Sequence, residues 1–180
     1  MLPVGLLMKE HRVIERMIVL LAQEGARIRA AKKADLVFLD AAVDFIKTYA
    51  DECHHGKEEN ILFRDLRKKA VADDHRKMME QLIREHVYGR QTVAALVDAR
   101  NGYAGGDGRR LQDIEKEMGK LAAFYPRHID KEDNRFFFPV MAYFSEKEKE
   151  GMLEECLEFD RSMIHAKYTQ IVAALEGRKG

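Results

Sequence analysis

The chain has 180 residues, of which 46% are hydrophobic, so it can fill one hydrophobic core and hardly two. Its 31 basic and 31 acidic side chains cancel, and therefore neither a nucleic acid nor a membrane surface is an expected partner. No apolar run approaches the length that spans a bilayer, no secretory signal begins the chain, and Cys53 and Cys156 are far apart, so we expect a cytoplasmic protein with reduced thiols.

The spacing of apolar residues predicts an all-α protein, because they recur at steps of three and four throughout. The first helix carries His11 on its apolar stripe, which is Leu7, His11, Ile14, Ile18, Leu21, Gly25 and Ile28. A second helix is predicted from about Ala34 to Leu66, with His54 and Glu58 on its apolar side. A third is predicted from about Asp74 to Arg100, with His86 on its apolar side.

The remaining helices follow a glycine-rich break. Four glycines in eight residues predict a loop from Asn101 to Gly108. The fourth helix follows it, with His128 and Glu132 on its apolar stripe, and a fifth begins at Ser145 with a capping box completed by Glu148. We therefore expect a bundle over residues 1–144 and a C-terminal helix over residues 145–180 packed on its outside.

An internal repeat relates the two halves of the bundle. HHGKEENILF (54 to 63) aligns with HIDKEDNRFF (128 to 137), and KEHRVIERMIVLL (9 to 21) aligns with REHVYGRQTVAAL (84 to 96). His128 lies 74 positions after His54, and His86 lies 75 positions after His11. Two motifs with nearly one offset predict a duplicated helical hairpin, and two such hairpins make an antiparallel four-helix bundle.

This arrangement predicts a metal site inside the bundle. Residues four apart share one helix face, so a histidine and a glutamate at that spacing can reach a common metal. Imidazole and carboxylate donors suit iron or manganese well and zinc acceptably. The predicted metal-binding residues, contributed by all four helices, are His11, His54, Glu58, His86, His128 and Glu132.

With these residues in view, the chain resembles the hemerythrin-like (HHE cation-binding) family, whose pattern is a lone His, HxxxE, a lone His and HxxxE. The resemblance covers roughly residues 6 to 142 and implies an up-down-up-down bundle that holds two iron ions with an oxo or hydroxo bridge, for which zinc or manganese can substitute. The long C-terminal helix with FDRSMIHAKY also resembles a subgroup of that family.

Two departures from the oxygen-carrying hemerythrins bear on function. Those proteins have a second histidine one turn along the third helix, where this chain has Arg90, so the oxygen-carrier role is in doubt. They also usually place the last carboxylate five residues after its histidine, a position that Asp133 occupies here. The assignment of Glu132 as a metal-binding residue therefore depends on the internal repeat.

Other polar residues are expected beside the metal-binding side chains or at the surface. His55, Glu59 and Asp133 belong to this set, because Ile129 replaces His55 in the second copy. Glu15 and Arg90 take equivalent places one turn after His11 and His86, where they are either exposed charges or a pair that faces each other beside the metals. Tyr125 is expected in the core, with a hydroxyl that could donate a hydrogen bond at the site. Glu10 and Glu85 could accept a hydrogen bond from a metal-binding imidazole.

These residues leave several functional classes open. The leading hypothesis is a diiron protein that binds or reacts with O₂, NO or H₂O₂ in sensing or detoxification. It would be an enzyme if it turns that molecule over, and a sensor if the fifth helix reports to a protein partner. The alternatives are an iron-sensing, iron-handling or signalling module without turnover, and a structural bundle without metal. The sequence assigns no role to His165 on the fifth helix.

Overall fold

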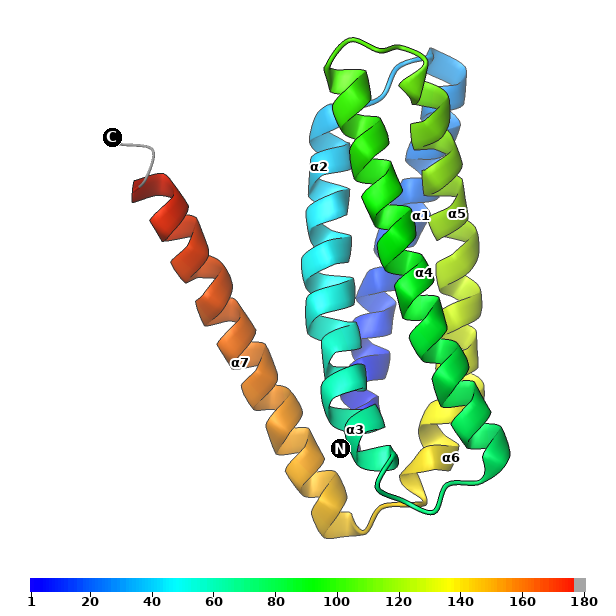
Figure 1. The fold of residues 1–180 in the computed structure, drawn as a ribbon, viewed down its shortest axis with the longest axis vertical. Helices are drawn as coiled ribbons and strands as arrows, with labels where there is room; N and C mark the ends of the chain where they lie inside the picture. Colours follow the sequence, from blue (N-terminus) through cyan, green and yellow to red (C-terminus); the bar gives the residue numbers. More distant parts are fainter. Residues whose placement is uncertain (177–180) are drawn as a thin grey trace.

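The computed structural model describes the backbone of residues 1–176 and the side chains of residues 1–163. Four helical columns run antiparallel (Figure 1). The first column is α1 (Pro3–Ala31), and the third is α4 (Asp73–Ala104). The second column is made of four consecutive segments: α2 (Leu36–Asp44), η1 (Phe45–His55), η2 (Glu58–Phe63) and α3 (Arg64–Leu66). The fourth column is made of three: α5 (Arg110–Lys131), η3 (Glu132–Phe136) and α6 (Phe137–Met141). The predicted all-α, up-down-up-down bundle with an added C-terminal helix is confirmed.

Three segments of the second and fourth columns are π-helical, with i to i+5 hydrogen bonds, and the sequence pattern did not predict them. They are η1, η2 and η3, and η3 begins 74 residues after η2, which is the offset of the internal repeat. Single π-helical turns inside α-helices are rare and frequently mark functional sites. Here each of the two HxxxE motifs ends at the first residue of such a segment, Glu58 and Glu132.

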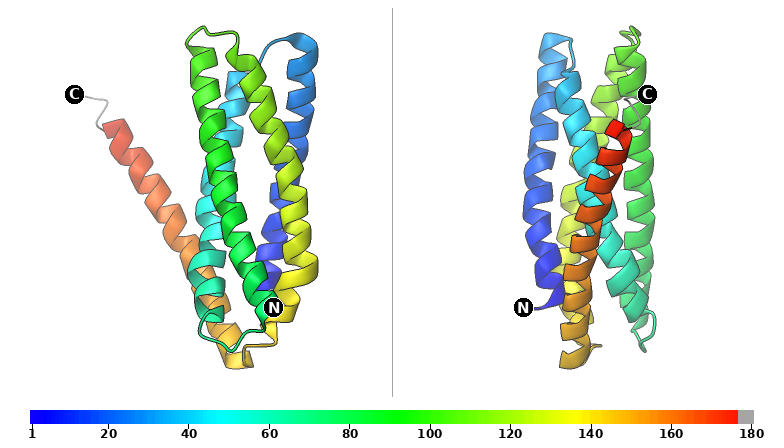
Figure 2. Two further views of the ribbon diagram at one scale, coloured as in Figure 1. Left: turned by 45° about the vertical axis from the view of Figure 1, so that its right-hand side comes forward. Right: turned by 90° about the vertical axis from the view of Figure 1, so that its left-hand side faces the viewer.

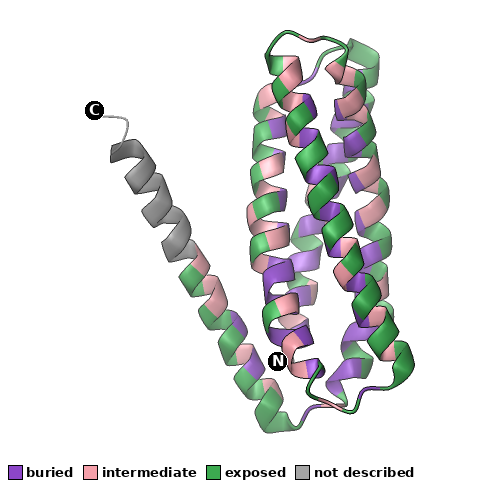
Figure 3. Cartoon of the chain, viewed as in Figure 1, coloured by how far each residue is buried: buried purple, intermediate pink, exposed green. Residues whose placement is uncertain are grey.

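The hydrophobic core is divided into two clusters by a layer of buried polar residues. One cluster, which includes Ile14, Leu39, Leu96 and Leu121, fills the end of the bundle near the break between α4 and α5. The other, which includes Leu7, Phe63, Leu82 and Phe137, fills the opposite end. Figure 3 shows buried positions along the inner faces of all four columns. The apolar clusters thus hold four helices in register around a polar middle layer.

The fifth helix, α7 (Glu146–Glu176), begins with the predicted capping box. The backbone amide of Ser145 donates to Glu148 at 2.8 Å, and that of Glu148 donates to the Ser145 hydroxyl at 3.4 Å. The helix contacts α1, η1 and η2, and Figure 2 shows it beside the bundle at the end where α3 and α6 lie. Met152 and Cys156 from α7 are buried in the second core cluster. The division at residues 144 and 145 stays a prediction, and the side chain of His165 lies outside the described residues.

The predicted loop from Asn101 to Gly108 is wrong at its start, because α4 continues to Ala104. Gly102 lies within α4 and packs against the Arg110 side chain of α5. A Cβ added at Gly102 would lie 2.9 Å from the Nε atom of Arg110, so the close approach of this side chain requires glycine. Within residues 101–108, Gly106 has a φ of +100°, a backbone conformation that other residues rarely adopt. In the described part of the chain, no helix is both long and apolar enough to cross a membrane.

Candidate metal centre

The polar middle layer brings all six predicted metal-binding side chains together. His11 comes from α1, His54 and Glu58 from the second column, His86 from α4, and His128 and Glu132 from the fourth column. None of the six is more than 2% exposed, although such groups are almost always on the surface unless paired. The bundle therefore buries four imidazoles and two carboxylates at one level.

Each of the two carboxylates lies between histidines of the two halves. One oxygen of Glu58 lies 3.3 Å from His54 Nε2, and the other lies 3.1 Å from His86 Nε2. One oxygen of Glu132 lies 3.2 Å from His11 Nε2, and the other lies 3.2 Å from His128 Nε2. Two groups of side chains in the layer place possible ligand atoms close enough together to hold a metal ion, and Glu58 is in both: His11, His54, Glu58 and Glu132, and His55, Glu58, His86 and His128.

The inward-facing atoms of this layer have no hydrogen-bond partner. They are Nε2 of His11, His54, His86 and His128 and both carboxylate oxygens of Glu58 and Glu132. They lie close to one another but are not aligned for hydrogen bonds. A buried polar atom without a partner costs about 1–3 kcal/mol, and more if it is charged, so eight together need an explanation. Cations bound among them would satisfy all eight, and the donor set fits that role.

The other ring nitrogen of each histidine donates to a carboxylate. The Nδ1 atoms of His54 and His128 lie 2.8 Å from Glu10 and 2.9 Å from Glu85. Those of His11 and His86 pair with the remaining two carboxylates, Asp133 at 2.7 Å and Glu59 at 2.6 Å. Such a bond places the proton on Nδ1 and leaves Nε2 as a lone-pair donor, which is the arrangement of most metal-binding histidines.

The contacts of Glu132 and Asp133 indicate different roles for these two neighbouring carboxylates. Both oxygens of Glu132 face the histidines without a hydrogen bond. Asp133, in contrast, accepts from His11 through one oxygen and from Arg12 through the other. The structure therefore favours Glu132, rather than Asp133, as the carboxylate aimed at a cation.

The second half of the site contains a fifth imidazole that the sequence had placed beside the metals or at the surface. His55 is 2% exposed and its Nδ1 atom lies 3.1 Å from Asp51, so a surface position is wrong. Its ring stacks on His86, with centroids 3.9 Å apart and planes at 11°. Nitrogen lone pairs lie in their ring planes, and two parallel stacked planes do not meet at one ion. In this conformation His55 lies beside the metal-binding set rather than within it.

Of the two alternatives for Glu15 and Arg90, exposed charges or a pair that faces each other, the structure does not show the pair. Glu15 contacts Arg12 at 3.1 Å, and Arg12 bonds Asp133. Arg90 donates to Asp51 and to Glu59, each at 2.8 Å. Arg90 therefore contacts directly a carboxylate that orients a histidine, whereas Glu15 is linked to one through Arg12. Tyr125 is buried as predicted, and its ring is parallel to that of His55 at 6.4 Å.

A third group of possible metal-binding atoms, Glu10, Cys53 and Asp160, is already filled by an ammonium group. The buried Lys57 side chain bonds Glu10 and Asp160 and lies 3.5 Å from the Cys53 sulfur. Burial raises the pKa of the Cys53 thiol to about 12, so it stays protonated at neutral pH. This cluster is an ion-pair network rather than a metal site.

Without cations, protons balance the buried carboxylates. Burial alone would lower the pKa of His11, but Asp133 and Glu132 raise it to about 10. Burial would also lower the pKa of His86, which Glu132, Glu58 and Glu59 raise to about 11. Burial alone would raise the pKa of Glu58, which the nearby positive charge of His54 holds well below its usual range. In the metal-free chain, protonated histidines therefore neutralise the buried carboxylates, and a bound metal ion would take over this role.

These pKa values predict opposite pH dependences for the stability of the metal-free chain and for the stability gained on adding metal. His11 and His86 have folded-state pKa values above the ordinary 6.5, so the stability they add is complete below pH 6.5 and is lost as pH rises through 10 and 11. The free energy of unfolding of the metal-free chain should fall between pH 7 and 9, by at most about 1.4 kcal/mol per pH unit for each group. The gain on adding metal should rise over the same range, because binding displaces these protons. Urea unfolding at pH 7, 8 and 9, with and without metal, measures both slopes, and a metal-free chain that becomes more stable toward pH 9 would contradict the charge balance.

Comparison with known proteins agrees with this geometry. Residues 2–140 match the family model described as hemerythrin HHE cation binding domain. Neither the curated proteins nor the solved structures contain a significant match to this chain. The match covers most of the chain, including all six side chains of the buried layer, and the buried clusters of histidine and glutamate fit a metal site. The chain therefore belongs to the hemerythrin HHE cation-binding domain family.

Proposed function

We propose that the protein is a cytoplasmic non-haem diiron protein that binds or reacts with O₂, NO or H₂O₂ in sensing or detoxification. The observation that carries the proposal is the set of eight inward-facing nitrogen and oxygen atoms without partners, divided between two pairs of histidines. Mixed imidazole and carboxylate donors in a helix bundle are a recurrent arrangement for paired iron ions. The proposed metal-binding residues are His11, His54, Glu58, His86, His128 and Glu132.

The chain's own residues hold this layer in place and restrict water around it. Aromatic rings cover three of the histidines: Phe137 stacks on His11 at 5.6 Å, Phe63 on His86 at 6.0 Å and Phe124 on His128 at 5.2 Å. With two imidazoles and two shared carboxylates for each ion, positions remain for a small molecule. Iron there would supply redox chemistry and Lewis acidity. The carboxylates behind the imidazoles fix the ring orientation that this chemistry needs.

A kinetic experiment tests the proposal. The chain is loaded anaerobically with two equivalents of Fe(II) and mixed with O₂, NO or H₂O₂, while the optical spectrum and the concentration of the added molecule are followed. The proposal expects a spectral change with at least one of the three, with repeated consumption for an enzyme or reversible binding for a sensor. Iron-loaded protein that is spectroscopically silent toward all three would overturn it.

The sensor class is favoured by a chain of contacts from the site to α7. His54 donates to Glu10, and Glu10 accepts from Lys57, which also bonds Asp160 on α7. The equivalent lysine in the second half, Lys131, bonds Glu85 and has no such bond to the side chains of α7 that the structure describes, which end at residue 163. The proposed protein partner would respond to the position of α7, because Lys57 links this helix through Glu10 to His54, one of the proposed metal-binding residues.

A further inference from the structure

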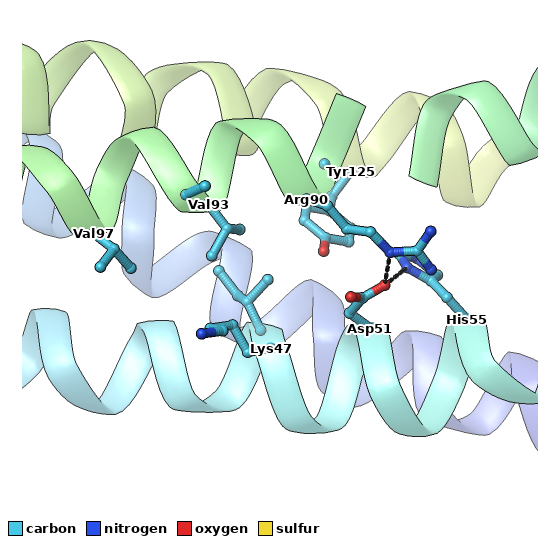
Figure 4. A pocket seen from close by; sticks show the side chains of 10 residues that line it. Lys47, Asp51, His55, Arg90, Val93, Val97 and Tyr125 are labelled. Atoms are coloured by element: carbon cyan, nitrogen blue, oxygen red, sulfur yellow. Dashed lines mark hydrogen bonds and ion pairs between the residues drawn. The ribbon is translucent and has the colours of Figure 1, made fainter. Parts of the chain in front are cut away.

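A cavity of about 250 Å³ lies between the second column and α4, next to the second pair of histidines (Figure 4). Its walls are mostly apolar, with Ile46 from η1 and Val93, Ala94 and Val97 from α4. O₂, NO and H₂O₂ are each far smaller, since a water molecule takes about 30 Å³ of liquid volume. A 150 Å³ apolar cavity engineered in another protein binds benzene, so this cavity has room for a substituted aromatic ring.

Hydrogen-bonding groups occupy the inner end of the cavity. Tyr125 is 2% exposed, and its hydroxyl makes no hydrogen bond within the described part of the chain. Figure 4 shows this hydroxyl directed into the space between α4 and η1. His55 forms the neighbouring wall, and its imidazole separates the cavity from His86 by one ring stack of 3.9 Å. A molecule in the cavity could therefore bond Tyr125 while lying next to the proposed metal centre.

Asp51 and Arg90, the charged groups of the cavity next to His55, are already paired with each other. Asp51 accepts from Arg90 at 2.8 Å and from His55 at 3.1 Å, and Arg90 also donates to Glu59 at 2.8 Å. A charged ligand would have to compete with these bonds for the guanidinium or the carboxylate. Lys47, at the exposed edge of the cavity, is the remaining charged group in the lining. The inner end thus suits an uncharged polar group.

We propose that this cavity binds a small uncharged aromatic alcohol, with its ring against Ile46 and Val93 and its hydroxyl at Tyr125. The proposal goes beyond the diatomic or peroxide ligand of the metal centre, and it does not require the metals to be present. The bound ring would be positioned one imidazole away from His86, so an organic molecule and the small ligand of the metals could be held side by side.

Binding of 4-methylphenol to the full chain, measured by calorimetry with and without iron, tests the proposal. Saturable binding at one site per chain is expected in both forms. Toluene, which lacks the hydroxyl, should bind about fivefold more weakly, as expected for one hydrogen bond. Equal affinity for toluene, or tighter binding of benzoate, would overturn the proposed ligand class.

Two substitutions locate the site. Ala94→Phe places a ring in the cavity and should weaken binding by at least tenfold, whereas Ala95→Phe, at the next exposed position of α4 and outside the lining, should not. Tyr125→Phe should make the affinities for 4-methylphenol and toluene equal. The proposal is wrong if both alanine variants bind equally well or if Tyr125→Phe keeps the preference for the alcohol. Because these measurements are also made without metal, their failure is distinguishable from failure of the diiron proposal.

Discussion

Replacing Glu58 with glutamine is expected to cause the largest loss of metal binding of any single change. Its two oxygens lie 3.3 Å from His54 and 3.1 Å from His86, and it belongs to both groups of candidate ligand atoms. The amide keeps the size of the side chain but loses the negative charge and one oxygen donor. Substituting a residue that only hydrogen-bonds a metal-binding side chain typically lowers metal affinity 10–100-fold. Glu58→Gln changes a proposed metal-binding side chain itself, so it should lower metal affinity more than about 100-fold.

The control is Glu52→Gln, an exposed glutamate on η1 in the same column. Both variants should keep the helical circular dichroism of the parent, and only Glu58→Gln should lose bound iron in equilibrium dialysis. If Glu58→Gln binds two ions with the affinity of the parent chain, the two carboxylates do not share the cations.

Replacing Lys57 with methionine is expected to have the largest effect on the metal-free fold. The side chain is fully buried, and burial alone would lower its pKa, but hydrogen bonds to Asp160 and Glu10 raise it, so Lys57 stays charged. Removing one partner of a buried ion pair costs about 3–5 kcal/mol, and we expect the lower end because Asp160 is 27% exposed. Urea unfolding should show this loss, and limited proteolysis should cut within α7 faster than in the parent.

Lys131→Met is the matched control, since Lys131 is the repeat equivalent but is 17% exposed and bonds only Glu85. It should cost about 1 kcal/mol or less and leave cleavage of α7 unchanged. If the protein is a sensor, the coupling must be reciprocal. Docking of α7 and metal binding then change each other's equilibrium constants by the same factor. Iron should slow the cleavage of α7 in the parent chain, and an unchanged rate would contradict the link through Lys57.

The sequence predicted the main architecture because apolar periodicity and the internal repeat report the same geometry. His11 and His86 fall on apolar stripes, and the two HxxxE motifs share one offset, so the four columns and the six inward side chains follow from spacing alone. The family match and the all-helical fold confirm that part. The assignment of these side chains as metal-binding residues stays a proposal.

Of the two positions expected for His55, beside the metal-binding side chains or at the surface, the surface one is wrong, because the spacing argument assumed α-helical turns. The i to i+5 hydrogen bonds of η1 put more residues in each turn, which rotates both His54 and His55 inward. One signal could have placed it: the repeat equivalent of His55 is Ile129, an apolar residue that is 3% exposed. This equivalence indicates that the position after the first histidine of the motif faces inward in both copies, although in the second copy it lies in α5, which is α-helical.

The sequence predicted that carboxylates would accept hydrogen bonds from the histidines, but it did not predict which histidine each carboxylate would bond. Glu10 precedes His11 in the sequence and yet accepts from His54, and Glu85 precedes His86 and yet accepts from His128. Each bond crosses between helices, so it depends on how far the helices are rotated. The same limit applies to Arg90, whose partners Asp51 and Glu59 come from the neighbouring column.

A crystal structure of the iron-loaded chain, with anomalous diffraction recorded at the iron absorption edge, would locate the metal centre directly. Two anomalous peaks are predicted between Glu58 and Glu132, one beside His11 and His54 and the other beside His86 and His128. If the folded chain, crystallised with excess iron, shows no peak in this layer, or shows its peaks at Cys53 and Asp160 instead, the buried layer is not the metal centre.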